Sequence, residues 1–148
     1  MTQPTLDSSL EHTLILVKPD AYRRGLTGEI LARFERKGYR ISALKLVQAD
    51  RDLLDAHYAE HKDKHFYADL VTYMTSQPLV AAVLSGEQVV AGARTLTGST
   101  QPTTADPGTI RGDFGRDWGG RAIENVIHAS DSPSAAEREI GVWFPELV

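Results

Sequence analysis

His128 is the residue of this sequence best suited to chemistry at neutral pH. It follows the apolar residues Val126 and Ile127 and precedes a polar run, so the rigid end of a strand would present its imidazole. Neutral imidazole is a nucleophile near pH 7 because its unperturbed pKa is about 6.5. The chain has no cysteine, which excludes a thiolate nucleophile. The plainer alternative is a hydrogen-bonded histidine at a strand end, the usual case for a lone histidine.

Residues downstream of His128 are placed to support its ring. Ser130 follows almost at once, and Ser132-Pro133 is a strong helix start, because serine caps the first turn and proline fits the first helical position. That helix would carry Glu139 back toward Ser130 and the imidazole. The pattern therefore favours a functional histidine over an isolated one.

Several cations could form a local site for a small anion: Lys18, Arg94, Arg111, Arg116 and Arg121. Arginine suits phosphate because its planar guanidinium can bind two oxygens at once. The net charge of −4 argues against a protein that coats nucleic acid through bulk electrostatics. For most arginines the alternative is a solvated surface charge.

The other histidines do not form a recognisable metal motif. His57, His61 and His65 recur at every fourth position, but we expect the helix to break between His61 and His65. No cysteine or carboxylate pattern completes a zinc site, so we predict a polar helix edge. The chain also lacks a P-loop, a dinucleotide-binding glycine motif after its first strand and a nucleophile elbow.

The composition is that of one soluble domain. The chain has 148 residues, of which 41% are hydrophobic and 24% charged, and we expect a single domain over residues 1–148. No disulfide is possible, and no apolar run approaches the ~20 residues of a membrane span. Residues 1–11 are polar, lack the features of a secretory signal and are expected to form a flexible extension. The expected location is the cytoplasm.

The elements that must position these residues alternate between strand and helix. Strands are expected at 13–17, where Pro19 ends the pairing, and at 39–47, 79–84 and 126–128. Helices are expected at 26–38, 50–60, 66–75, 87–96, which Gly92 weakens, and 132–141. The glycine-rich segment 97–121 is expected to be a long functional loop. This order fits an α/β (α+β) sandwich whose helices cover one face of a four-stranded, mainly antiparallel sheet.

Separated motifs in this order resemble the nucleoside diphosphate kinase family. They are Leu16-Val17-Lys18-Pro19-Asp20, Arg24-Gly25-Leu26-x-Gly28-Glu29-Ile30, Pro107-Gly108-Thr109-Ile110-Arg111-Gly112-Asp113, Asn125-x-x-His128-Ala129-Ser130-Asp131 and Glu139-Ile140-Gly141-x-Trp143-Phe144. The resemblance runs from Glu11 to the end of the chain. It implies a ferredoxin-like sheet with a long nucleotide-contacting loop.

The resemblance also implies a reaction. The γ-phosphoryl group of a nucleoside triphosphate, mainly ATP, would pass to a nucleoside diphosphate by a ping-pong mechanism through a phosphohistidine on His128. The implied nucleotide-binding residues are Lys18, Phe66, Arg94, Thr100, Arg111 and Asn125, and the supporting residues are Tyr58, Ser130 and Glu139.

Individual roles follow from the same resemblance. Lys18 and Asn125 would reach the ribose hydroxyls and the phosphate side, while Phe66 would stack on any base, since every base has a π-face. Arg94, Thr100 and Arg111 would hold the phosphates. Mg²⁺ would arrive bound to the nucleotide phosphates, because the sequence offers no metal cage. The family is oligomeric, which implies a homo-oligomer, either a hexamer or a tetramer.

Each assignment has a plainer alternative. Phe66 could belong to the core face of an amphipathic helix, and Tyr58 could also be core. Arg94 could complement a helix dipole, and Lys18 could simply end a strand. Thr100 is one of many loop threonines. The resemblance to the family favours the functional interpretation of every one of these residues.

The sequence departs from the family pattern in two places. His128 follows Arg111 by 17 positions, a longer interval than the family's, and the extra residues fall within 115–123. They could add Arg116 or Trp118 to a subunit or nucleotide contact. Ala129 stands where glycine is most frequent, which is tolerable if its φ stays below zero.

Two other function classes remain open at this point. A binding or regulatory module could recognise RNA on its sheet, but it would need exposed aromatic side chains on the central strands, which here are mostly aliphatic. A histidine-dependent phosphohydrolase would need further motif histidines and would release free phosphate without an acceptor.

Overall fold

The computed structural model describes residues 5–148, so residues 1–4 of the predicted N-terminal extension lie outside the described part. Over that range the sheet consists of β1 (His12–Val17), β2 (Arg40–Val47), β3 (Leu79–Ser85) and β4 (Ile127–Ala129), in the order β2-β3-β1-β4. Every neighbouring pair is antiparallel. The predicted four-stranded antiparallel sheet is confirmed.

The helices surround this sheet. They are α1 (Pro19–Arg23), α2 (Thr27–Lys37), α3 (Arg51–His57), α4 (Tyr67–Thr75), α5 (Val89–Thr97), α6 (Ile110–Phe114), α7 (Pro133–Trp143) and a final 3-10 turn, η1 (Pro145–Leu147). Ser132 caps α7 as expected, accepting a hydrogen bond from the backbone N–H of Ala135, and Asp50 caps α3 in the same way through Leu53.

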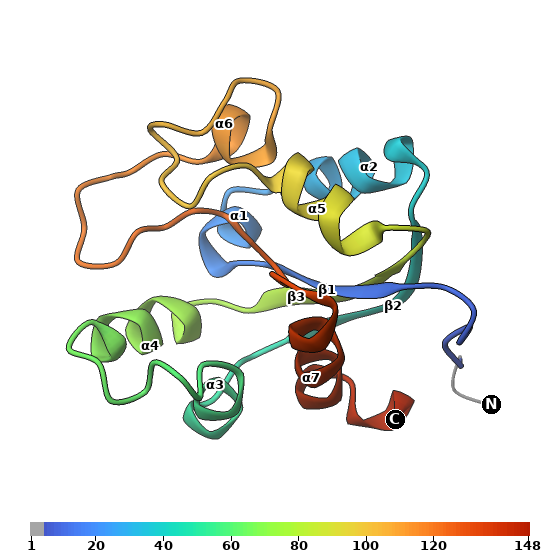
Figure 1. Cartoon of the computed structure of the whole chain (residues 1–148). Coiled ribbons are helices and arrows are strands. Elements are labelled where there is room, and N and C mark those ends of the chain that lie inside the picture. Colours follow the sequence, from blue (N-terminus) through green and yellow to red (C-terminus); the bar gives the residue numbers. More distant parts are fainter. Residues whose placement is uncertain (1–4) are drawn as a thin grey trace.

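Helices cover both faces of the sheet, so the prediction that they cover one face is wrong. Figure 1 shows α2 and α5 on one side of the sheet and α3 and α7 on the other. The physical reason lies in β3, which is buried at every position. Alternate residues of such a strand enter two different cores: Ala82 and Leu84 pack with α2 and α5, whereas Ala81 and Val83 pack with α3, α4 and α7.

This burial bears on RNA binding by the sheet. The central strands β1 and β3 carry aliphatic side chains that lie beneath helices on both faces. The surface that such a binding mode needs is therefore covered in the described part of the chain. Separately, no helix within residues 5–148 is long and apolar enough to cross a membrane.

Two short helices were not predicted. Pro19, interpreted only as the end of a strand, is also the first residue of α1, where its missing N–H does no harm. The segment 97–121 is not structureless, because it contains α6, whose first turn is capped by the Thr109 hydroxyl. This correction matters because α6 carries Arg111.

Gly92 has a packing reason inside α5. A Cβ at this position would lie 1.6 Å from the Tyr39 hydroxyl oxygen and 2.6 Å from Cζ of the same ring. The glycine that weakens the helix on propensity grounds therefore makes room for a side chain that packs against the core.

Candidate active site

A cavity of about 660 Å³ opens beside β4, and most of the predicted site residues line it. Those residues are Lys18, Tyr58, Arg94, Thr100, Arg111, Asn125, His128 and Glu139. They come from the end of β1, the segment after α3, α5 and the loop that follows it, α6, β4 and its preceding turn, and α7. Two predicted residues, Ser130 and Phe66, are not part of the lining.

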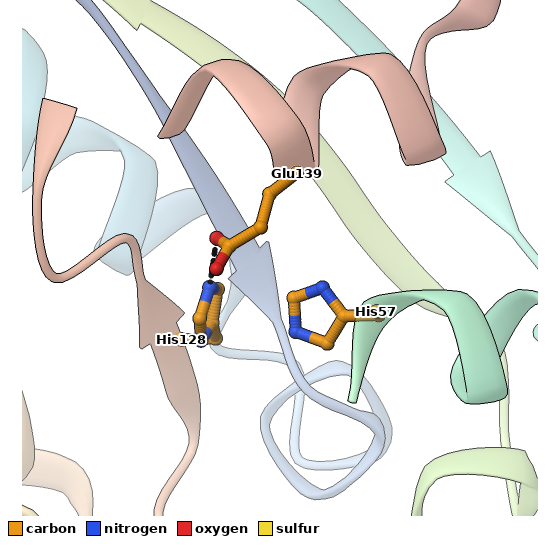
Figure 2. A group of neighbouring side chains, drawn as sticks. All are labelled: His57, His128 and Glu139. Atoms are coloured by element: carbon orange, nitrogen blue, oxygen red, sulfur yellow. Dashed lines mark hydrogen bonds and ion pairs between the residues drawn. The ribbon is translucent and has the colours of Figure 1, made fainter. Parts of the chain in front are cut away.

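His128 is held by Glu139. The imidazole lies on β4, paired with Leu16 of β1, and its Nε2 is 2.7 Å from Oε1 of Glu139, which projects from α7 (Figure 2). Ser130, fully buried behind the site, donates its hydroxyl to the same oxygen at 2.8 Å. The supporting arrangement expected from the sequence is therefore present as geometry.

The electrostatics of this pair favour a neutral imidazole beside a charged carboxylate. Burial lowers the pKa of His128 more than the hydrogen bond to Glu139 raises it. For Glu139, burial favours the neutral acid, but the hydrogen bonds from His128 and Ser130 outweigh it and hold its pKa below the usual value. A neutral ring that donates Nε2–H carries its lone pair on Nδ1.

Lys18 is a buried cation in contact with Asn125. Its Nζ donates to Asn125 Oδ1 at 2.8 Å, and the amide nitrogen of Asn125 donates to the backbone carbonyl of Thr100 at 3.0 Å. Burial and the neighbouring Arg111 lower the pKa of Lys18 to about 7, against the opposing effect of Asp20. Its charge is thus sensitive to any anion that enters the cavity.

Arg111 is almost fully buried, and three of its guanidinium N–H groups donate to backbone carbonyls. It donates to the carbonyls of Asn125 at 3.2 Å, Gly98 at 3.1 Å and Ile127 at 2.6 Å. Because a guanidinium has five N–H donors, two remain for a ligand. Arg94, in the last turn of α5, donates to the carbonyl of Ala129 at 3.3 Å and also reaches the cavity.

The aromatic residues occupy different positions. Tyr58 lines the cavity and also packs against the core, so its two interpretations are compatible. Phe66 precedes α4 with 39% of its surface exposed, so the interpretation as core is wrong. Its ring lies 5.8 Å from the ring of His61, which lines the cavity. Phe66 therefore lies next to a residue of the cavity lining.

His57 was misjudged from the sequence. It was predicted to lie on a polar helix edge, but it is buried, and its Nδ1 accepts a hydrogen bond of 3.0 Å from the indole Nε1–H of Trp143. Its ring points toward His128 (Figure 2), with 4.7 Å between the ring centroids. The available signal was the i, i+3 spacing of Leu54 and His57, which places both on the buried face of α3.

Arg138 was also missed. It lines the cavity, and its guanidinium donates to the backbone carbonyls of Ala56 and His57 at 3.0 and 3.2 Å. The same group lies 3.7 Å from the second carboxylate oxygen of Glu139. Arg138 thus ties α7 to the end of α3, next to the residue that holds His128.

His57, His128 and Glu139 have ligand atoms within 4.8 Å of one another, a spacing that permits a metal ion. The hydrogen bond from Trp143 argues against this use. Since Nδ1 of His57 accepts this hydrogen bond, the neutral ring carries its own proton on Nε2 and has no lone pair to offer there. Two imidazoles and one carboxylate are also a poor match for Mg²⁺, which prefers oxygen ligands.

The family model for nucleoside diphosphate kinases matches residues 11–147, nearly the whole chain. The chain belongs to the nucleoside diphosphate kinase family. It is therefore a phosphotransferase, and the family predicted from separated motifs is confirmed.

Relatives within the nucleoside diphosphate kinase family are similar over most of their length. The enzyme of Corynebacterium diphtheriae is 54% identical over 138 residues, which cover 93% of this chain and 98% of that one. The enzyme of Archaeoglobus fulgidus is 50% identical over 137 residues, covering 93% and 88%. The family match over residues 11–147 includes every residue of the cavity lining.

Solved structures of nucleoside diphosphate kinases share the fold. The enzyme of Borrelia burgdorferi, in a transition-state mimic with bound vanadate and ADP, superposes with a TM-score of 0.85 at 38% identity, over 94% of this chain and 90% of that one. The enzyme of Encephalitozoon cuniculi, without ligand, gives a TM-score of 0.83 at 38% identity, over 90% and 88%. The predicted ferredoxin-like architecture is confirmed.

Proposed function

We propose that this nucleoside diphosphate kinase carries the phosphoryl group on Nδ1 of His128, with ATP as its main donor. The observation that carries the proposal is the 2.7 Å hydrogen bond from His128 Nε2 to Glu139. It uses the proton of one ring nitrogen and leaves the lone pair on the other. Lys18, Arg94 and Arg111 line the same cavity and supply the positive charge that a triphosphate requires.

Each half-reaction is then a simple displacement. The Nδ1 lone pair attacks the γ-phosphorus, the bond from phosphorus to the β–γ bridging oxygen breaks, and the nucleoside diphosphate leaves with that electron pair. The ring becomes an imidazolium whose Nε2–H still donates to Glu139, so the carboxylate stabilises the new positive charge. A terminal oxygen of a second diphosphate reverses the step. One site thus serves both substrates, which gives ping-pong kinetics.

The nucleotide contacts are assigned by the same logic. The two N–H donors of Arg111 that make no backbone hydrogen bond suit phosphate oxygens. Lys18 and Asn125 form a hydrogen-bonded pair that offers donors to ribose hydroxyls and phosphate, and Thr100 adds a hydroxyl nearby. Phe66, exposed next to His61 of the cavity lining, would stack on the base without reading its edge. The site would then accept every base.

Mg²⁺ would neutralise charge on the nucleotide phosphates and help to orient them. The cavity lining includes the acidic residues Glu60 and Asp131. Among the described residues, however, the group spaced to hold a metal ion is His57, His128 and Glu139. The donor set therefore fits a cation that comes with the nucleotide.

A homo-oligomer is also proposed, either a hexamer or a tetramer. The edge strand β2 exposes Leu44 and Leu46 with 53% and 60% of their surface accessible. Apolar side chains on an unpaired strand edge suit a contact with another copy. A cytoplasmic location completes the proposal, because the substrates are nucleoside di- and triphosphates.

Incubation with γ-labelled ATP and Mg²⁺ tests the mechanism. We expect an acid-labile, base-stable phosphoprotein, a gain of one phosphate in intact mass, and transfer of the label to GDP. His128→Ala should take no label. His12→Gln is the matched control, because His12 lies at the far end of β1 and bonds Ser85 and the backbone of Asp7. Label that survives His128→Ala refutes the proposal.

The same experiment separates a kinase from a phosphohydrolase. The observation that favours a hydrolase is the contact between the imidazoles of His57 and His128. Release of free phosphate from ATP in the absence of GDP, at the rate of transfer in its presence, would identify a hydrolase. We expect the label to stay on the protein until a diphosphate is added.

A further inference from the structure

The backbone just before His128 is strained. Val126 has a φ of 62°, in the left-handed region, and its side chain is fully buried. The N–H of Ile127 donates to the carbonyl of Asn125 at 2.7 Å, so Val126 is the central residue of a γ-turn of the rarer, strained kind. Positive φ is highly unfavourable for a β-branched residue. Such a conformation persists only where surrounding groups enforce it.

Three residues hold this turn through hydrogen bonds: Asp20, Lys18 and Arg111. The carboxylate of Asp20 accepts the N–H of Val126 at 3.2 Å, and the N–H of Lys18 donates to the carbonyl of Val126 at 2.9 Å. Arg111 donates to the carbonyls on either side of Val126. Asp20 is the one acidic side chain among these groups and the one that takes the N–H of the strained residue itself.

Asp20 is itself fixed. It is fully buried near the start of α1, and its second carboxylate oxygen accepts the hydroxyl of Tyr73 from α4. A buried carboxylate is unfavourable unless hydrogen bonds satisfy it. Here those bonds connect two helices to the turn, so the position of Val126 is set by the packed core.

The turn has a geometric consequence for the cavity. Along a regular strand, side chains alternate between faces, so Asn125 would point with Ile127 and Ala129 into the core beneath α2 and α5. Instead, Asn125 and His128 line the same cavity. The reversal at Val126 is what brings the partner of Lys18 to the side of the sheet that carries the imidazole.

We propose that Asp20 is a positioning residue, which holds the strained turn at Val126 and thereby places Asn125 and His128 on one cavity. It acts through the backbone and does not touch the nucleotide. This inference rests on the proposed function for its activity readout.

A double-mutant cycle tests the inference, because glycine adopts positive φ without the penalty of a Cβ. Val126→Gly and Val126→Ala are compared in the Asp20 protein and in D20A, by kcat/KM for transfer from ATP to GDP. With Asp20 present, the two variants should differ by less than about threefold. In D20A the glycine variant should exceed the alanine variant by about tenfold, since nothing then enforces the left-handed conformation.

A merely structural role of Asp20 predicts no change in the ratio of the two variants. Glycine relieves the strain of a positive φ whether or not Asp20 is present, so kcat/KM of the folded glycine and alanine variants would keep one ratio in both backgrounds. If D20A does not fold, D20N keeps the shape and one acceptor, and the glycine variant should still exceed the alanine variant by about threefold.

The outcomes distinguish the two proposals. The role of Asp20 is overturned if the glycine and alanine variants have the same ratio of kcat/KM with and without the Asp20 substitution. That conclusion holds when the unmodified protein takes label from ATP. An unmodified protein that takes no label refutes the phosphohistidine mechanism instead. The thermal unfolding of every variant is recorded, so that activity is compared only among folded proteins.

Discussion

Nε2 of His128 and Oε1 of Glu139 lie 2.7 Å apart, and that carboxylate oxygen also accepts the hydroxyl of Ser130. Glu139 therefore fixes which ring nitrogen keeps its proton and provides a negative charge beside the imidazole. Substitution of this one residue should affect both the rate of phosphoryl transfer and its dependence on pH.

Glu139→Gln should lower kcat at neutral pH by about 100-fold, the usual effect of removing one preorganised charge. It should also move the acid limb of the pH–rate profile to lower pH. The hydrogen bond and charge of Glu139 raise the pKa of His128 against the effect of burial, so without them the ring stays neutral in more acidic solution. Rapid-quench kinetics across pH checks both effects.

The matched control for this variant is Glu137→Gln, an exposed residue of the same helix. It removes one negative charge without touching the imidazole, so rate and pH profile should stay unchanged. An acid limb that moves to higher pH in Glu139→Gln would contradict the assignment of the charges.

Lys18 should take up a proton when ADP binds at pH 8. Burial and Arg111 lower its pKa to about 7, so the free enzyme holds mostly neutral lysine at that pH. Phosphate charge raises the pKa again. Calorimetry in buffers of different ionisation enthalpy measures the uptake, and Lys18→Met should abolish it. Equal uptake by both proteins would show that another group titrates.

The same residue makes stability depend on pH. Because the folded pKa lies below that of an unfolded lysine, the unfolded chain binds more protons between pH 7 and about 10.4. The free energy of unfolding should therefore rise with pH through this window. In Lys18→Met that rise should be smaller, as urea titrations at pH 7 and pH 9 can measure.

Trp143→Phe should destabilise the fold by about 1–3 kcal/mol, because it leaves Nδ1 of His57 buried without its donor. The melting temperature should fall by roughly 2–4 °C for each kcal/mol lost. Trp118→Phe is the control, since that indole is 52% exposed and its replacement should matter by less than about 0.5 kcal/mol. Equal losses in the two variants would show that the His57 contact contributes nothing.

Two glycine substitutions should have opposite signs. Gly92→Ala should lower stability although alanine favours helix, because the new Cβ meets the Tyr39 ring. Gly141→Ala, in α7, meets no atom within 4 Å and should raise stability by up to about 1 kcal/mol. Thermal unfolding of the two variants checks the order. A stabilised Gly92→Ala protein would mean that Tyr39 moves aside freely.

Periodic segments were predictable because their own side chains determine them. Ile30 and Phe34, four positions apart, lie on the buried face of α2, where a helix was expected at 26–38, and Ser132-Pro133 predicted the start of α7. The motifs around Arg111 and His128 predicted the family, since each is short, specific and separately placed. Helices on both faces were missed, although the uninterrupted apolar run of β3 indicates burial on both sides.

The parts that escaped prediction depend on contacts between distant segments. Nothing local in Val126 indicates a left-handed turn, because β-branched residues avoid it and only Asp20, Lys18 and Arg111 enforce it. The burial of His57 depends on Trp143, far along the chain. The five-residue helix α6 lies in a glycine-rich stretch with little periodicity, so propensity alone does not reveal it.

The fold brings together around the cavity four residues from four different segments: Lys18, Arg94, Arg111 and His128. A nucleotide that contacts all of them binds the native chain and not the denatured one, so its affinity adds to the free energy of folding, by about 2.7 kcal/mol at a hundredfold excess over Kd. Depletion of nucleotide would leave the same enzyme more open to proteases, so its abundance would follow the total concentration of nucleoside di- and triphosphates.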